Sequence, residues 1–152
     1  MHAPLIAVLA LATAGLAQPW SSPHQIELER HRDHPVLEEL IGDGGAPSIP
    51  LLPRARPAGQ KGVVFGFLPY WIDKYYYENL DYEVLTHIAA FSLEMNADGT
   101  IADSNGWPWT ALVDSAHAHG VRVILTATLF GDGQVLSLIA DDEHRQTFFR
   151  EM

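Results

Sequence analysis

The stretch "VVFGFLPYW", residues 63–71, decides the fold class of this chain. It is a continuous apolar run of β-branched and aromatic residues, which is typical of a strand buried on both faces, and it ends in a proline and two aromatic residues. Two further apolar runs follow, "LTHIAAFSLEM" from residue 85 and "VRVILTATLF" from residue 121. The runs predict strands over residues 63–68, 85–93 and 121–128.

Helical segments separate these strands. "PWTALVDSAHAHG" has Pro108 where a first helical turn tolerates it and Gly120 where the left-handed residue after a last turn is expected. Asp98-Gly99 is a turn signal, and Asp141 is placed as the N-cap of a later helix. Apolar strands that alternate with helices predict an α/β fold with adjacent parallel strands in chain order and helices on the outer face.

Composition excludes several classes of function. The 152 residues include 9 Lys and Arg against 19 Asp and Glu, and no cysteine. Nucleic-acid binding is not expected because it needs clustered basic residues, so neutral or weakly charged partners are favoured. Without cysteine there is neither a disulfide nor a thiolate metal site.

Residues 1–17 are interpreted as a signal peptide. An apolar run from Leu5 to Leu16 ends in the small-x-small pattern Gly15-Leu16-Ala17, and it is shorter than the roughly 20 residues of a membrane-spanning helix. The alternative is an uncleaved N-terminal anchor, because the n-region lacks Lys and Arg. Either interpretation places the protein outside the cytoplasm, secreted or in the periplasm or cell envelope, without a stable membrane span.

Residues 18–60 are rich in Pro, Gly, His and charge, and they are predicted to be a linker or pro-region, because such composition buries too little apolar area to offset its ordering entropy. Ser22-Pro23 resembles a helix start, with Ser22 as N-cap, and a short helix is expected to about Arg32. "HPVLEELI" could add another turn before Gly42.

The residues after the three strands are aromatic, hydroxyl-bearing or small. In parallel α/β folds the carboxyl ends of the strands build the functional site. Flat aromatic faces suit the apolar faces of sugar rings, whereas a phosphate site would show a glycine-rich loop with a lysine. The pattern therefore indicates a carbohydrate partner and no cofactor.

The three strands resemble those of glycoside hydrolase family 18, the chitinases and their relatives. "GFLPYW" is similar to the first-strand "GYYPSW" of that family, "LTHIAAFS" to its second-strand "LTHINYAFA", and "VRVILTATLF" to its third-strand "VKVLLSIGGW". The resemblance covers residues 63–152 and implies the N-terminal part of a family 18 catalytic domain over residues 61–152. The implied fold is the first three βα units of an incomplete (β/α)8 TIM barrel, which when complete has about 250 residues and eight strands.

The same resemblance implies a function on β-linked N-acetylglucosamine polymers, either chitin or peptidoglycan glycan. The catalytic signature of the family, Asp-Gly-x-Asp-x-Asp-x-Glu on the fourth strand, does not occur in these 152 residues, and its place is expected beyond Met152. Assignment as an enzyme therefore stays open, and no catalytic residue is named. The alternative is a non-catalytic, lectin-like relative. The third strand also departs from the family, because Thr126-Ala127-Thr128-Leu129 stands where Ser-x-Gly-Gly is expected.

Five substrate-binding residues follow from the resemblance. Phe67 and Phe91 would line the floor of a sugar subsite, Tyr70 and Trp71 its rim, and Thr126 would support the acid cluster by hydrogen bonding. Three of them have an equally good structural interpretation, since the phenylalanines suit barrel core and threonine is common in any strand, whereas Tyr70 and Trp71, at a strand end after Pro69, favour a functional role.

Other conspicuous residues are assigned structural roles. His87 is interpreted as a hydrogen-bonded core residue, and His117 and His119 are rejected as a zinc pair because residues two apart on a helix face different directions. Tyr75-Tyr76-Tyr77 is interpreted as a packing cluster rather than a sugar platform. Asp98, Asp103 and Asn105 lack the EF-hand spacing for calcium, so no metal site is predicted.

Overall fold

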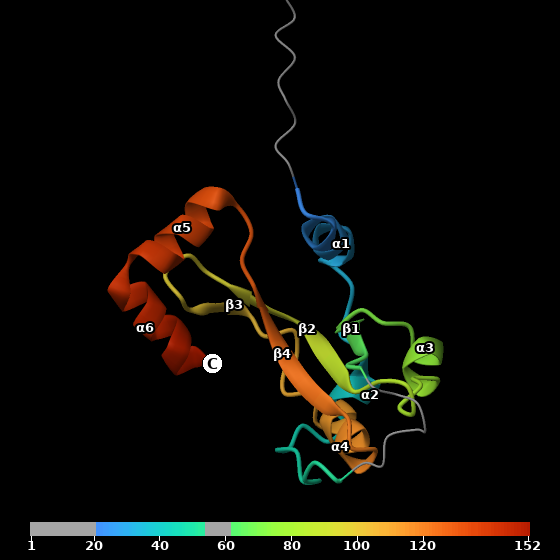
Figure 1. The fold of residues 1–152 in the computed structure, drawn as a ribbon. Coiled ribbons are helices and arrows are strands. Elements are labelled where there is room, and N and C mark those ends of the chain that lie inside the picture. The colour runs from blue at the N-terminus through green and yellow to red at the C-terminus, as the bar shows by residue number, and fades with distance from the viewer. Residues whose placement is uncertain (1–20, 54–61) are drawn as a thin grey trace, which may run out of the picture.

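The computed structural model describes residues 21–53 and 62–152 (Figure 1). The interpretation of residues 1–17 as a signal peptide lies outside these residues. Within them, no helix is long and apolar enough to cross a membrane. The elements in chain order are α1 (Pro23–His31), α2 (Glu38–Ile41), β1 (Phe65–Pro69), α3 (Lys74–Glu78), β2 (His87–Met95), β3 (Ile101–Asp103), α4 (Thr110–Ala118), β4 (Arg122–Thr128), α5 (Asp132–Ala140) and α6 (Asp142–Glu151).

The three predicted strands are adjacent and parallel, as expected. β2 is central and pairs with β1 on one side and β4 on the other, so that Gly66, Ile88 and Val123 lie in one row. β3, which was not predicted as a strand, pairs antiparallel with the end of β2 after the turn at Asp98 and Gly99. The described residues thus form an open four-stranded α/β sheet.

One face of the sheet is covered by helices. Leu68, Ile88 and Ala90 point to this face and are buried in a core that also contains Leu112 and Ala116 of α4. α2 packs against α4 on the same side (Figure 1). At Gly42, the residue after α2, an added Cβ would lie 3.0 Å from Ala111 Cβ, so the two helices approach closely.

The opposite face carries exposed apolar side chains. Phe65, Phe67 and Ile124 alternate with the buried positions of their strands, and all three are exposed. The expectation that helices lie on the outer face alone is nevertheless wrong at one point. α1 lies against the carboxyl end of this second face, where the His24 ring is 5.3 Å from the Phe67 ring.

The segment predicted as a linker or pro-region supplies part of the core. Leu28 of α1 and Leu40 of α2 are both fully buried in the same core as the sheet residues. The expectation that this segment buries too little apolar area to pack is therefore wrong for residues 23–41. Its helix start is confirmed, because the Ser22 hydroxyl accepts the amide of Gln25 at 3.1 Å and Pro23 opens α1. Whether the segment is processed as a pro-region stays a prediction.

Two other helix ends also match the sequence. The Asp141 carboxylate accepts the amides of Glu143 and His144, at 2.8 and 3.2 Å, as the N-cap of α6. Gly120 follows α4 with a φ of 69°, in the left-handed region that glycine occupies at helix ends. α4 itself begins at Thr110 and not at Pro108.

Candidate functional site

The carboxyl ends of the three parallel strands bring three of the five predicted site residues together. Pro69, Phe91 and Thr126 are aligned in one row across the strands. A cavity of about 240 Å³ opens beside this row. Its lining consists of Ser22, His24, Phe67, Phe91, Thr126, Ala127, Thr128, Leu129 and Phe130. Phe67, Phe91 and Thr126 thus share one surface, which is what a common role in binding requires.

Tyr70 and Trp71 adjoin that cavity through Phe91. The Trp71 ring meets Phe91 edge-on at 5.9 Å, and Tyr70 meets Trp71 edge-on at 4.7 Å. We call Phe67, Tyr70, Trp71 and Phe91 the aromatic cluster. Tyr70, which was expected at a rim, is only 1% exposed, and this burial, followed by the charge of Glu94, raises the pKa of its hydroxyl.

Helix α1 contributes residues to this site that sequence reasoning did not assign. The His24 ring lies 5.3 Å from Phe67 and 5.7 Å from Phe91. The His31 ring stacks on Trp71, with centroids 4.9 Å apart and planes 5° from parallel. The only sequence signal for this helix is its start at Ser22 and Pro23, which predicts a helix but not where it packs.

A buried polar network supports the end of β2. The hydroxyls of Ser92 and Thr128 are 2.9 Å apart, and Thr128 also donates to the carbonyl of Leu93 at 3.1 Å. The Asn105 side-chain amide donates to the carbonyl of Ser92 at 2.8 Å. The register between β2 and β4 shifts between Phe91 and Leu93, and this irregularity directs β2 toward the network. The supporting hydroxyl at this end is therefore that of Thr128, while Thr126 lines the cavity.

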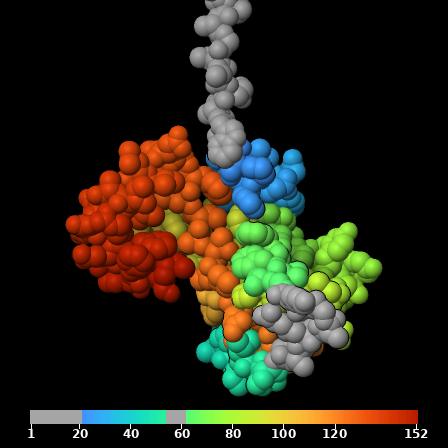
Figure 2. Space-filling view, viewed as in Figure 1, coloured from blue at the N-terminus to red at the C-terminus, as the bar shows by residue number. Residues whose placement is uncertain are grey.

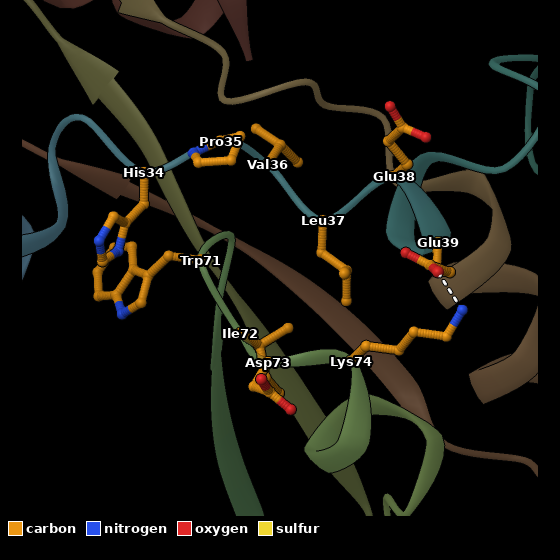
Figure 3. Close-up of a pocket in the computed structure, with 10 residues that line it drawn as sticks. All are labelled: His34, Pro35, Val36, Leu37, Glu38, Glu39, Trp71, Ile72, Asp73 and Lys74. Atoms are coloured by element: carbon orange, nitrogen blue, oxygen red, sulfur yellow. Dashed lines mark hydrogen bonds and ion pairs between the residues drawn. The ribbon is translucent and has the colours of Figure 1, made fainter.

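A second, larger cavity of about 530 Å³ lies on the outer side of Trp71 (Figure 3). Trp71 and His34 stand at one end of it, and an ion pair between Lys74 and Glu39 stands at the other. The hydrogen bond from Lys74 lowers the pKa of Glu39, and the same bond raises the pKa of Lys74. The charges of this pair are satisfied by each other, and the pair links α2 to the first residue of α3.

Glu94 is the next-to-last residue of β2, and it has a partner from the N-terminal segment. Arg32, just after α1, donates to Glu94 Oε2 at 3.2 Å. The Glu94 side chain is 16% exposed. It lines a third cavity, of about 290 Å³, together with Gln25, Leu28 and Arg32. The pair links the residues after α1 to the sheet.

The residues assigned structural roles have protein partners. His117 Nδ1 lies 2.7 Å from the carbonyl of Ile49, and the His119 ring stacks on Tyr82 at 4.6 Å. His87 is half-buried, with Nδ1 2.9 Å from the Thr86 hydroxyl. No group of three potential metal ligands occurs in residues 21–53 and 62–152.

The tyrosine run behaves differently from the expectation of a packing cluster. Tyr77 packs against the core, but Tyr75 and Tyr76 are both exposed, with their rings edge-on at 5.6 Å. Only one of the three is therefore a packing residue. The other two present their rings to solvent on the short helix α3.

Comparison with known proteins gives one similarity. No protein-family model matches the chain, and no curated protein sequence matches it. Among solved structures it is similar to a chitinase from Bacteroides thetaiotaomicron, with 25% sequence identity and a TM-score of 0.49 over 59% of this chain. The match covers 30% of the length of that chitinase. A TM-score this low leaves the fold and the function to be argued from the residues of this chain.

Proposed function

We propose that this chain is the N-terminal part of an exported glycoside hydrolase of the family 18 type, acting on β-linked N-acetylglucosamine polymers. The observation that supports this most directly is the shared cavity of Phe67, Phe91 and Thr126, with Trp71 packed against Phe91. The adjacent parallel strands β1, β2 and β4 correspond in this proposal to the first three βα units of a (β/α)8 barrel. The polymer is chitin or peptidoglycan glycan.

The chemistry of the cavity suits a neutral sugar. Its lining is aromatic, aliphatic and hydroxyl-bearing, and among the described residues that line it none is a carboxylate, lysine or arginine. The aromatic faces of Phe67 and Phe91 would cover the apolar face of a pyranose ring, while the hydroxyl of Thr126 would bond its polar edge. Apart from the imidazole of His24, the described residues of this lining offer a charged ligand no ionisable partner.

In this proposal the chain supplies the wall of the site and not its acid. A family 18 relative would use a glutamate to protonate the leaving oxygen, while the 2-acetamido group of the substrate attacks the anomeric carbon, an exception to the two-carboxylate scheme. The signature that holds this glutamate does not occur in the 152 residues. We therefore expect no hydrolysis of N-acetylglucosamine oligomers by this chain alone.

A non-catalytic, lectin-like protein is the second candidate function. It is favoured by the absence of a carboxylate from the described residues that line the cavity, because binding needs the aromatic wall only. The residue that ends the fourth-strand motif in the whole protein separates the two: a glutamate indicates a hydrolase, and a leucine or glutamine indicates a lectin.

The test is binding of the N-acetylglucosamine hexamer, measured by titration calorimetry on this chain and two variants. Phe67→Ala removes a cavity-lining ring, and a lost stacking interaction of about 0.5–1.5 kcal/mol should weaken binding roughly 2- to 10-fold. Phe149→Ala, which removes an exposed phenylalanine of α6, is the matched control and should bind as the parent does. Equal binding by all three proteins, or tighter binding of a glucose hexamer, would contradict the proposal.

A further inference from the structure

Helix α1 contacts every member of the aromatic cluster. Its first turn places the His24 ring beside Phe67 and Phe91, at 5.3 and 5.7 Å. Its last residue, His31, stacks on Trp71 and accepts the Tyr70 hydroxyl on its backbone carbonyl at 3.1 Å. In Figure 2 the surface of α1 meets the surface of the β1 region, which carries three of these four residues.

The contacts occupy the ring faces that a sugar would need. An imidazole stacked on Trp71 at 4.9 Å, with the planes 5° from parallel, has the geometry that a pyranose ring would adopt on that face. Tyr70 is buried, and Phe91 is buried. The cavity that remains, about 240 Å³, is smaller than the roughly 300–1,000 Å³ of ordinary ligand pockets. With α1 in place, an oligosaccharide has access to Phe67, which is 58% exposed, and to the side of Trp71 that faces the 530 Å³ cavity, but not to the stacked face of Trp71 or to Tyr70.

The packing of α1 is incomplete. Leu28 is its one buried residue, and a helix of nine residues is marginal in water without tertiary contacts. Cavities of about 240, 290 and 490 Å³ separate it from the end of β4 and the start of α5, and residues of α1 or its N-cap line all three. These cavities are open to solvent, so on this side α1 borders grooves instead of packing closely against β4 and α5.

Displacement of α1 would remove one buried residue, Leu28, from the core, while α2 and α4 keep their own contacts with it. Residues 32–37 follow the helix, and at their end the Leu37 amide donates to the Tyr70 carbonyl at 3.1 Å. The next element, α2, is held by the fully buried Leu40. Between these points the exposed Arg32 pairs with Glu94, and a pair with one solvent-exposed member adds little stability. The chain after α1 is thus fixed at Leu37 and α2, while α1 itself is held only weakly to the sheet.

We propose that α1 is a built-in cover of the aromatic cluster, which occupies the glycan-binding surface and must be displaced before an oligosaccharide binds. The inference rests on the proposed function, since it takes the cluster to be the sugar site. The apparent affinity is then the intrinsic affinity multiplied by the fraction of molecules in which α1 is open, so it is low when that fraction is small. Any change that loosens α1 should tighten glycan binding. If α1 instead formed part of the binding surface, the same change should weaken binding.

The experiment compares two alanine substitutions on α1. Leu28→Ala removes its one buried anchor, and Ile26→Ala removes a similar side chain that is 44% exposed. Amide hydrogen exchange of residues 23–31 reports opening, and calorimetry with the N-acetylglucosamine hexamer reports binding. We expect Leu28→Ala to speed exchange and to tighten binding about tenfold or more, with little change for Ile26→Ala.

A second variant covers the case in which Leu28→Ala does not fold. His24→Ala with His31→Ala removes the two rings that lie on the cluster and leaves Leu28 in place, and it should also tighten binding. Three results would contradict the proposal that α1 covers the cluster. They are faster exchange without tighter binding, weaker binding by the double histidine variant, and an equal gain in affinity for Ile26→Ala. If no variant binds the hexamer even when exchange shows α1 open, the proposed function fails, and the cover fails with it. If the parent and the opened variants bind equally, only the cover fails.

Discussion

Asp114 and Ile49 are joined by a hydrogen bond in which the Asp114 carboxylate accepts the Ile49 amide at 2.8 Å. The same oxygen accepts the Ser48 amide at 2.8 Å, and the second oxygen accepts the Ser48 hydroxyl at 3.1 Å. The bond from Ile49 is the largest cause of a lowered Asp114 pKa, followed among the favourable contributions by those from Ser48. One side chain of α4 thus holds the segment that follows α2.

This arrangement predicts a local dependence on pH. A carboxyl group whose pKa is lower in the folded state than its unfolded value of about 3.9 stabilises the fold fully above that unfolded value. The stabilisation is lost as the pH falls through the folded-state pKa. Amide exchange at Ser48 and Ile49 should therefore show constant protection from pH 7 to about 5, with loosening below about pH 4.

Asp114→Asn provides the control for that prediction. The variant keeps one carbonyl acceptor but loses the charge, so the segment should already be less protected at pH 7. Because His117 also contacts Ile49, some protection should remain. Unchanged protection in the variant would show that the segment is held by other contacts.

Leu40→Ala tests whether residues before β1 belong to the domain. Leu40 is fully buried against the sheet and α4, and a buried Leu→Ala substitution costs about 2–5 kcal/mol. That is a large share of the roughly 5–15 kcal/mol that stabilises a domain. Denaturant unfolding should show the loss, while Leu51→Ala, at an exposed position, should change the free energy of unfolding by less than about 0.5 kcal/mol. Similar results for both would indicate that α2 is not part of the cooperative unit.

The strands were predictable because each is a continuous apolar run, the pattern of a strand buried on both faces. The expected burial holds for β2, whereas β1 and β4 expose Phe65, Phe67 and Ile124 on one face, which the run itself did not reveal. The packing of residues 23–41 could not be predicted, because the two buried leucines of this segment are far apart in a polar sequence whose mean composition resembles that of a linker. Burial there depends on where the segment lies, which is a tertiary property.

The candidate site was predictable where it is built from the strands and not where it is built from α1. Because register follows from adjacent parallel pairing, the carboxyl-end positions Phe67, Phe91 and Thr126 could be expected on one surface, and they are. The burial of Tyr70 could not be expected, since it results from α1, a helix that is distant in sequence and has no apolar stripe facing the cluster.

Gly99→Ala should separate α6 from the β2–β3 turn. Gly99 has a φ of 87°, a conformation that costs an alanine about 1–2 kcal/mol. An added Cβ would also lie 2.2 Å from the His144 carbonyl oxygen and 2.7 Å from the Phe148 amide nitrogen, both of them backbone atoms of α6 that cannot swing aside. We expect a lower thermal unfolding midpoint and faster amide exchange in α6.

Gly133→Ala is the matched substitution for that test. Nothing lies within 4 Å of a Cβ at this position near the start of α5, and alanine is preferred over glycine in a helix by about 0.5–1 kcal/mol. The midpoint should hold or rise. If Gly99→Ala is as stable as the parent and α6 exchanges at the parental rate, the contact between the turn and α6 is not a stabilising one.

The uncovered face of the sheet predicts self-association. Phe65 and Ile124 are exposed on this face, and in the described residues β1 and β4 each pair only with β2, so both leave a strand edge open. Exposed apolar surface on a sheet with open edges favours contact between molecules. Light scattering should show an apparent mass that rises with protein concentration.

Replacing Phe65 and Ile124 by threonine should reduce that association, because threonine keeps a strand preference while removing apolar area worth roughly 1 kcal/mol at each half-exposed position. Phe149→Gln, which removes an exposed phenylalanine of α6, is the control and should leave association unchanged. The comparison assigns the contact to one surface, since all three positions are exposed and only two lie on the sheet. A parent that remains monomeric at high concentration would mean that the uncovered face is tolerated in water. Loss of association in Phe149→Gln alone would place the contact on α6 instead.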